Sequence, residues 1–147
     1  MTQQNHLSTV AEWLARISIK HKDLGEHSIC PFARMPQIVS VEKLCMEEFA
    51  EIDDRLTIYM ENDIHSSYDQ LEQLCRQLKT LNPNFVFLPD HPHKINSING
   101  HETGNGKFPC IIVQTKRELD SARTSLLKTN YYQHWDEAYL SEIRSFD

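Results

Sequence analysis

The stretch SYDQLEQLCRQLKTLNPNFVFL, residues 67–88, describes a helix followed by a buried strand. Ser67 and Gln70 have the spacing of a capping box, in which a hydroxyl and an amide satisfy the free N–H groups at a helix start. Asn82-Pro83 ends this helix, and its apolar residues recur at helical spacing: Leu71, Leu74, Cys75, Leu78 and Leu81. Residues 85–88 are all apolar, which is typical of a strand covered on both faces.

Toward the C-terminus the same alternation continues. Residues 110–113 form a second apolar strand, and Thr115-x-x-Glu118 predicts the start of a helix that runs to about Lys128. Asn130 is predicted to cap a last helix, with its inward face formed by Trp135, Tyr139 and Ile143.

Toward the N-terminus, two further strands are expected at residues 38–44 and 55–60. Thr9-x-x-Glu12 predicts the start of a helix to about Lys22, with Gly25 close to its end. We therefore expect one domain over residues 1–147, of α/β (α+β) class, in which a mixed sheet of about four strands packs with helices.

Composition narrows the class of protein. A chain of 147 residues buries enough apolar surface to fold without cross-links. The sequence shows no apolar signal core and no run long enough to span a membrane, and its four cysteines have no CxxC spacing, so we expect a cytoplasmic protein with reduced thiols and no membrane partner. A net charge of −6 without a basic stripe argues against nucleic acid as a partner.

The segment from Pro89 to Pro109 is longer than the roughly 15 residues beyond which structureless loops become uncommon in compact domains. One interpretation is a plain surface hairpin, because Asn99-Gly100 is typical of a type I′ turn. The other is a site, because Asp90, His91 and His93 follow directly on a strand end, where ligands bind in many α/β proteins.

His91 and His93 raise the hypothesis of a metal site. Residues at i and i+2 point the same way when the chain is extended. The two imidazoles would then begin a site for zinc, iron or copper, completed by Cys110, His101 or the distant Cys30.

The sequence GHETGNGKF, residues 100–108, resembles a phosphate-binding loop but departs from its pattern. It has one residue too many between the glycines, Phe108 replaces the hydroxyl that would bind Mg²⁺, and a strand follows instead of a helix. A looser nest of backbone N–H groups at residues 104–107 remains as an interpretation.

Cys30 lies in the sequence HSICPFAR, residues 27–34, which its proline keeps out of regular structure. His27 and Arg34 are close enough in sequence to lower the pKa of the thiol and make it a nucleophile. The alternative is a small buried hydrophobe, since cysteine is among the most buried residue types.

The order of these pieces resembles an uncharacterised bacterial family built around a CPFA motif, here residues 30–33. Its other landmarks correspond to Trp13, to His91-Pro92 after an apolar strand, to the segment 105–109 and to Arg117-Glu118. The glycine and histidine content of the loop, and Cys110 at the start of the next strand, depart from that family. The resemblance implies an α/β fold in which the CPFA turn and the His-Pro loop act together, and it implies no activity.

These observations lead to two hypotheses. In the first, the Cys30 turn and the Asp90–Cys110 loop form a site for a small, anionic ligand. Catalysis would use Cys30, Cys110 and His91, and the ligand would be bound by Arg34, Asp90, Asn99, Asn105 and Lys107. In the second, the chain is a non-catalytic interaction protein whose partner binds the acidic stretch Glu42–Glu72.

Overall fold

A four-stranded mixed sheet forms the centre of residues 2–147, the part of the chain that the computed structural model describes. Its strands stand in the order β1-β2-β6-β3, with β1 parallel to β2 and β6 antiparallel to both of its neighbours. The strand bounds are Gln37–Val41 for β1, Thr57–Glu61 for β2, Phe85–Asp90 for β3 and Cys110–Thr115 for β6. The predicted fold class and four-stranded mixed sheet are confirmed.

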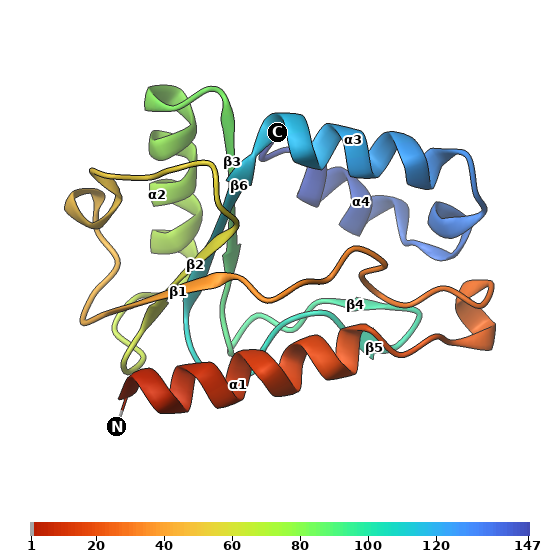
Figure 1. The fold of residues 1–147 in the computed structure, drawn as a ribbon, viewed down its shortest axis with the longest axis horizontal. Coiled ribbons are helices and arrows are strands. Elements are labelled where there is room, and N and C mark those ends of the chain that lie inside the picture. The colour runs from red at the N-terminus through yellow and green to blue at the C-terminus, as the bar shows by residue number, and fades with distance from the viewer. Residues whose placement is uncertain (1) are drawn as a thin grey trace.

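Helices cover both faces of this sheet, as Figure 1 shows. Helix α2 lies on one face and the other helices lie mainly on the opposite side. The α-helices are α1 (Thr2–Ile17), α2 (Tyr68–Leu81), α3 (Lys116–Leu127) and α4 (Glu137–Arg144). Short 3-10 helices are η1 (Lys22–Leu24), η2 (Met46–Phe49) and η3 (Tyr131–His134).

The α2 face holds a continuous apolar core. Leu71 and Leu78 of α2 are almost fully buried against Phe87 and Ile111 of the sheet, and burial of each leucine contributes about 2 kcal/mol. The predicted capping box is present, since Gln70 N donates to Ser67 Oγ (3.2 Å) and Ser67 N donates to Gln70 Oε1 (2.8 Å).

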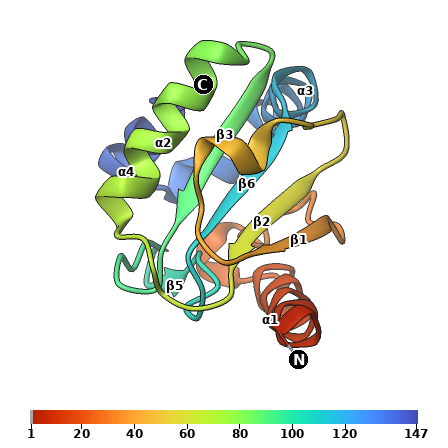
Figure 2. The ribbon, with the colours of Figure 1, turned by 90° about the vertical axis from the view of Figure 1, so that its left-hand side faces the viewer.

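The opposite face carries a second core, in which Trp13 of α1 and Ile29 belong to the same buried cluster as Ile58 and Met60 of β2, but it is covered less completely. Helices α1 and α3 lie far apart on that side (Figure 2), and the chain from residue 28 to residue 36 crosses between them (Figure 1). Leu88 and Ile112 are therefore only half-buried, although they belong to the two strands expected to be covered on both faces. The hollow that this arrangement leaves is described below.

The first helix begins earlier than predicted. α1 begins at Thr2, so Thr9 lies in the middle of the helix with its side chain buried. The T-x-x-E spacing also occurs inside helices, and here a single buried face runs through it: His6, Val10, Trp13 and Ile17.

Two helix ends also differ from prediction. α1 ends at Ile17, and Gly25, in the left-handed region at φ +65°, caps η1 instead. Asn130 precedes η3 rather than a long helix, and α4 begins only at Glu137. The predicted cap at Thr115 is confirmed, because its hydroxyl accepts from Glu118 N at 3.2 Å.

The long loop contains the predicted hairpin, β4 (Ser97–Ile98) paired with β5 (His101–Glu102). Asn99 and Gly100 have φ of 52° and 86°, as a type I′ turn requires. Two side chains of helix α1 hold the backbone of the hairpin in place. Trp13 Nε1 donates to Thr103 O (2.9 Å), and Arg16 donates to Glu102 O (2.7 Å) and to the carbonyl of Gly104.

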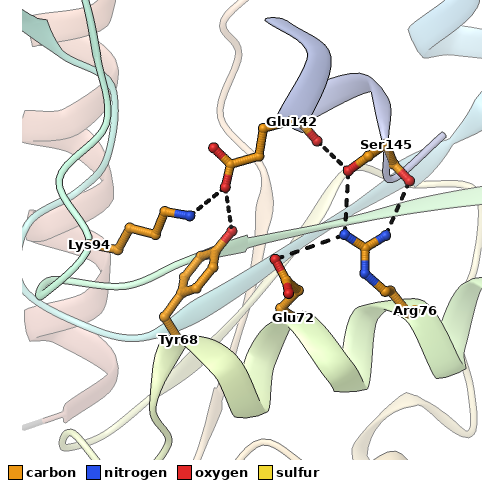
Figure 3. Close-up of polar contacts among 6 residues, drawn as sticks. All are labelled: Tyr68, Glu72, Arg76, Lys94, Glu142 and Ser145. Atoms are coloured by element: carbon orange, nitrogen blue, oxygen red, sulfur yellow. Dashed lines mark hydrogen bonds and ion pairs between the residues drawn. The ribbon is translucent and has the colours of Figure 1, made fainter. Parts of the chain in front are cut away.

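Helix α4 lies beside the edge strand β3 and is joined to α2 by polar contacts (Figure 3). Glu142 accepts from Tyr68 Oη at 3.2 Å and is paired with Lys94, which comes from the long loop. Arg76 donates to Ser145 O at 3.3 Å and stacks on the Phe146 ring. These contacts hold the C-terminal helix against both the α2 layer and the loop.

No helix within residues 2–147 is long and apolar enough to cross a membrane.

Candidate functional site

Several predicted site residues meet at the sheet edge where β1, β2 and β3 end and β6 begins. Asp90 of β3 is paired in register with Cys110 of β6. Its Oδ2 accepts from Asn105 N (3.0 Å) and Asn105 Nδ2 (2.6 Å), and Cys110 Sγ lies 3.9 Å away. All three side chains are buried. We call Glu61, Ser66, Asp90, His91, Asn105 and Cys110 the sheet-edge network.

The side-chain amide of Asn105 also makes hydrogen bonds within its own loop. Its Oδ1 accepts from Lys107 N (2.9 Å) and Phe108 N (2.9 Å), and its Nδ2 also donates to Phe108 O (3.0 Å). The backbone N–H groups of Asn105 and Lys107 therefore point to protein acceptors, which leaves fewer donors for the predicted anion nest at 104–107. Gly104 is required here, because a Cβ at this position would clash with Asp90 Oδ1.

Burial opposes catalysis by Cys110. The side chain has 0% exposure, and burial together with the nearby Asp90 raises the pKa of its thiol well above the ordinary value. A protonated, inaccessible thiol is a poor nucleophile. The predicted catalytic role of Cys110 is therefore not supported by its surroundings.

His91 has no ring nitrogen left for a metal or a proton transfer. Its Nε2 donates to Ser66 O at 2.7 Å, and its Nδ1 accepts from His93 N at 3.0 Å. The ring is 4% exposed, whereas the ring of His93 is exposed and lies 5.1 Å away between centroids. These contacts occupy both ring nitrogens of His91, so they do not favour His91 as metal ligand or catalytic base, or the His91–His93 pair as a metal site.

Sequence reasoning missed two buried polar residues at the same edge. Glu61 has 0% exposure, and its carboxylate accepts from Leu44 N (2.8 Å), His65 N (3.0 Å), Ser66 N (2.9 Å) and Ser66 Oγ (2.6 Å). His6 is also fully buried, with Nε2 donating to Glu61 O at 2.9 Å. The available signal was a lone carboxylate at the end of an apolar strand, TIYME.

A cavity of about 300 Å³ lies under the CPFA turn, on the face of the sheet that α1 and α3 cover. We call it the CPFA cavity. It is bounded by the sheet, α1, α3, η3 and α4, and Ile98 and Thr103 of the long loop also line it. The Cys30 turn and the hairpin part of the loop therefore share a cavity, whereas the sheet-edge network does not line it.

The predicted residues of the CPFA turn line this cavity. Cys30 is half-buried, and burial raises the pKa of its thiol, which disfavours the thiolate. Arg34 is exposed and donates to Glu118 Oε2 at 2.6 Å, and both side chains also line a wide open groove beside the start of α3. His27 is directed elsewhere, with Nε2 lying 2.7 Å from Asn130 Oδ1.

The two remaining predicted ligand-binding residues lie at the surface. Lys107 Nζ is 3.3 Å from Glu12 Oε2 in an exposed ion pair. Asn99 Nδ2 donates to Asp23 Oδ2 at 3.0 Å. Asp23 belongs to a group of potential metal ligands with His21 and His101, the one such group of three or more that residues 2–147 contain. We call these three residues the histidine corner.

Comparison with protein-family models, with curated proteins and with solved structures finds no significant match. The resemblance to the CPFA family therefore stays a prediction.

Proposed function

We propose that this protein binds a small amphipathic organic anion, with the apolar part of the ligand in the CPFA cavity and its acidic group at Arg34. The cavity is the observation that carries the proposal. Its volume of about 300 Å³ lies at the small end of the range for ligand pockets, which suits a compact molecule with one ring or a short chain.

The lining supports an apolar, aromatic ligand. Trp13, Trp135 and Tyr139 border the cavity, and the last two rings are stacked with centroids 5.4 Å apart. Leu88 and Ile112 form its floor on the sheet. Aromatic and aliphatic walls with few polar groups are typical of small-molecule sites.

The charge at the mouth supports an anionic group. Phe32, Arg34 and Glu118 line both the cavity and the open polar groove, so they stand where the apolar space meets solvent. The Arg34–Glu118 pair is about half exposed, at 52% and 49%, and such pairs contribute only about 0–1 kcal/mol. A ligand carboxylate can therefore replace Glu118 as the partner of Arg34 at little cost.

The proposal assigns no covalent step to Cys30. Because burial raises its thiol pKa, Cys30 is protonated at neutral pH and acts as a wall of the cavity.

Tryptophan fluorescence tests this proposal directly, because the chain has two tryptophans and both line the cavity. We would titrate the protein with 3-phenylpropanoate and with 3-phenylpropanol, which differ in the carboxylate alone. We expect the acid to bind roughly tenfold more tightly than the alcohol, the size of one charge-assisted hydrogen bond.

The variant R34Q should lose this preference, while K128Q, which removes the same charge at an exposed site outside the cavity, should keep it. Absence of any saturable fluorescence change with either compound would refute the cavity as a binding site. Equal preference for the acid in R34Q and wild type would refute the role of Arg34.

The alternative of a partner on the acidic stretch Glu42–Glu72 stays a prediction. Glu42, Glu47, Glu48 and Glu51 are exposed as it requires, but Glu61 is buried and takes no part in any surface.

A further inference from the structure

The histidine corner joins two segments that are distant in sequence. His21 and Asp23 lie at the turn after α1, and His101 lies on β5 of the hairpin. One ligand atom from each residue lies within 4.8 Å of the others. We propose that these three side chains bind a divalent first-row transition metal ion, with zinc as the expected ion. The site is separate from the CPFA cavity and does not depend on the proposed ligand.

The turn that carries His21 and Asp23 is held by its backbone. His21 N donates to His27 O at 3.1 Å, and His21 O accepts from Leu24 N (3.1 Å) and Glu26 N (2.9 Å). Leu24 is buried beneath the turn. The two potential ligands therefore stand on a short, well-defined loop rather than on a free chain end.

The hairpin that carries His101 is equally fixed. Ile98, which pairs with His101 across the two strands, is 1% exposed, and Thr103 N donates to Asn96 O at 3.0 Å. Together with the contacts that Trp13 and Arg16 make to its backbone, these interactions hold His101 against the η1 turn. A preformed arrangement favours metal binding, because less chain must be ordered when the ion binds.

The three side chains already interact in a way that an ion can take over. His101 Nε2 lies 3.1 Å and 3.0 Å from the two carboxylate oxygens of Asp23, and the His21 and His101 rings stack with centroids 3.8 Å apart. Zinc ligands lie about 2.0–2.2 Å from the ion and hence about 3.3 Å from one another in tetrahedral geometry. Rotation of the two rings out of their stacked arrangement would direct all three ligands at one ion, which then replaces the proton between His101 and Asp23.

Asn99 provides the outer support that metal-binding carboxylates usually have. Its Nδ2 donates to Asp23 Oδ2 at 3.0 Å and lies 3.3 Å from Asp23 O. A hydrogen bond of this kind orients the carboxylate and leaves its other oxygen for the ion.

The ligand set also indicates the class of ion. Two imidazoles and one carboxylate suit zinc and its first-row neighbours, whereas calcium and magnesium prefer oxygen ligands throughout. Three protein ligands leave a fourth position of a tetrahedral ion to water or to a small anion. Asp23 is exposed and the two histidines are half-buried, so solvent reaches the site.

The test is metal binding by protein prepared without a polyhistidine tag. Calorimetric titration with Zn²⁺ should show one ion per chain, and Co²⁺ should give the visible absorption bands of a tetrahedral site. We expect H21A, D23N and H101A each to weaken Zn²⁺ binding at least tenfold, and H93A, an exposed histidine outside the corner, to change it less than twofold.

Circular dichroism would establish that all variants are folded, which their exposed or half-buried positions favour. A raised melting temperature with Zn²⁺ in wild type but not in H101A would support the site independently. The proposal would be overturned by wild-type protein that takes up no ion, or by corner variants that bind Zn²⁺ as H93A does.

Discussion

At the sheet-edge network, Asp90 and His91 are buried, and protein partners occupy both nitrogens of His91. At the histidine corner, Asp23 and His101 are at least partly exposed, and their main contact is with each other. The two regions contain the same kinds of side chain but differ in the burial and the hydrogen-bond partners of those side chains. A carboxylate and an imidazole therefore indicate a ligand site only where solvent reaches them and where their hydrogen bonds are not already made to the backbone.

The strongest test of the network is removal of its central carboxylate. Glu61→Leu should lower the free energy of unfolding by about 3–5 kcal/mol, because it leaves buried N–H groups of Leu44 and Ser66 without their acceptor. Urea denaturation measures this. Glu51→Leu, an exposed change in the same acidic stretch, should stay within about 0.5 kcal/mol. Equal effects of the two variants would show that Glu61 is not structural.

The two neighbouring histidines offer a sharper contrast. His91→Ala should cost about 2–3 kcal/mol of stability, because the buried Ser66 carbonyl loses its donor and a small cavity opens. His93→Ala should cost less than about 0.5 kcal/mol, since its ring is exposed and its backbone N–H remains. The same urea titration compares them. Similar costs for both would contradict the assignment of His91 to the core.

The pH dependence of stability should reveal the raised pKa of the buried Asp90 carboxyl group. Burial raises the pKa of Asp90 in the folded protein. The folded state therefore binds this proton more tightly, and that contribution is full below the unfolded pKa of about 3.9 and is lost as the pH rises through the folded pKa. Asp90→Asn should consequently gain stability relative to wild type as the pH rises above about 4, as followed by unfolding at a series of pH values.

Asp53 provides the control with the opposite sign. Arg55 lowers the pKa of this exposed carboxyl group, so Asp53→Asn should lose stability relative to wild type as the pH rises. Parallel pH profiles for the two variants would contradict the opposite directions of the Asp90 and Asp53 pKa shifts.

The smallest expected effect concerns Cys30. Saturating 3-phenylpropanoate should slow its alkylation by iodoacetamide a few-fold, because the ligand would cover the cavity wall that Cys30 forms. Cys45, which precedes η2 and does not line the cavity, should react at an unchanged rate. Peptide mass spectrometry after timed labelling measures both. Unaltered labelling of Cys30 under conditions that saturate tryptophan fluorescence would place the ligand elsewhere.

Local sequence signals predicted much of the fold. The caps at Ser67 and Thr115, the apolar strands and the Asn99-Gly100 turn all depend on neighbouring residues, and all are present. The predicted start of α1 at Thr9 was wrong, because the T-x-x-E pattern of a capping box also occurs inside helices.

The candidate site was predicted less well, for a physical reason. His91 and His93 would point the same way only on an extended chain, but Lys94 N donates to His91 O in a tight turn, which directs the two rings differently. The histidine corner joins residues that are 78 apart in sequence, as His101 and Asp23 are. Such contacts depend on how distant segments pack, which local spacing in one sequence does not reveal.

The hydrogen bonds from α1 to the hairpin affect which amino-acid substitutions the hairpin can accept. Trp13 and Arg16 bind the carbonyl groups of Glu102, Thr103 and Gly104, and every amino acid supplies a carbonyl. The attachment therefore tolerates replacement of an exposed side chain such as that of Glu102. Exposed positions of the hairpin can therefore vary while the hairpin keeps its place, whereas Gly104 and the buried Ile98 cannot.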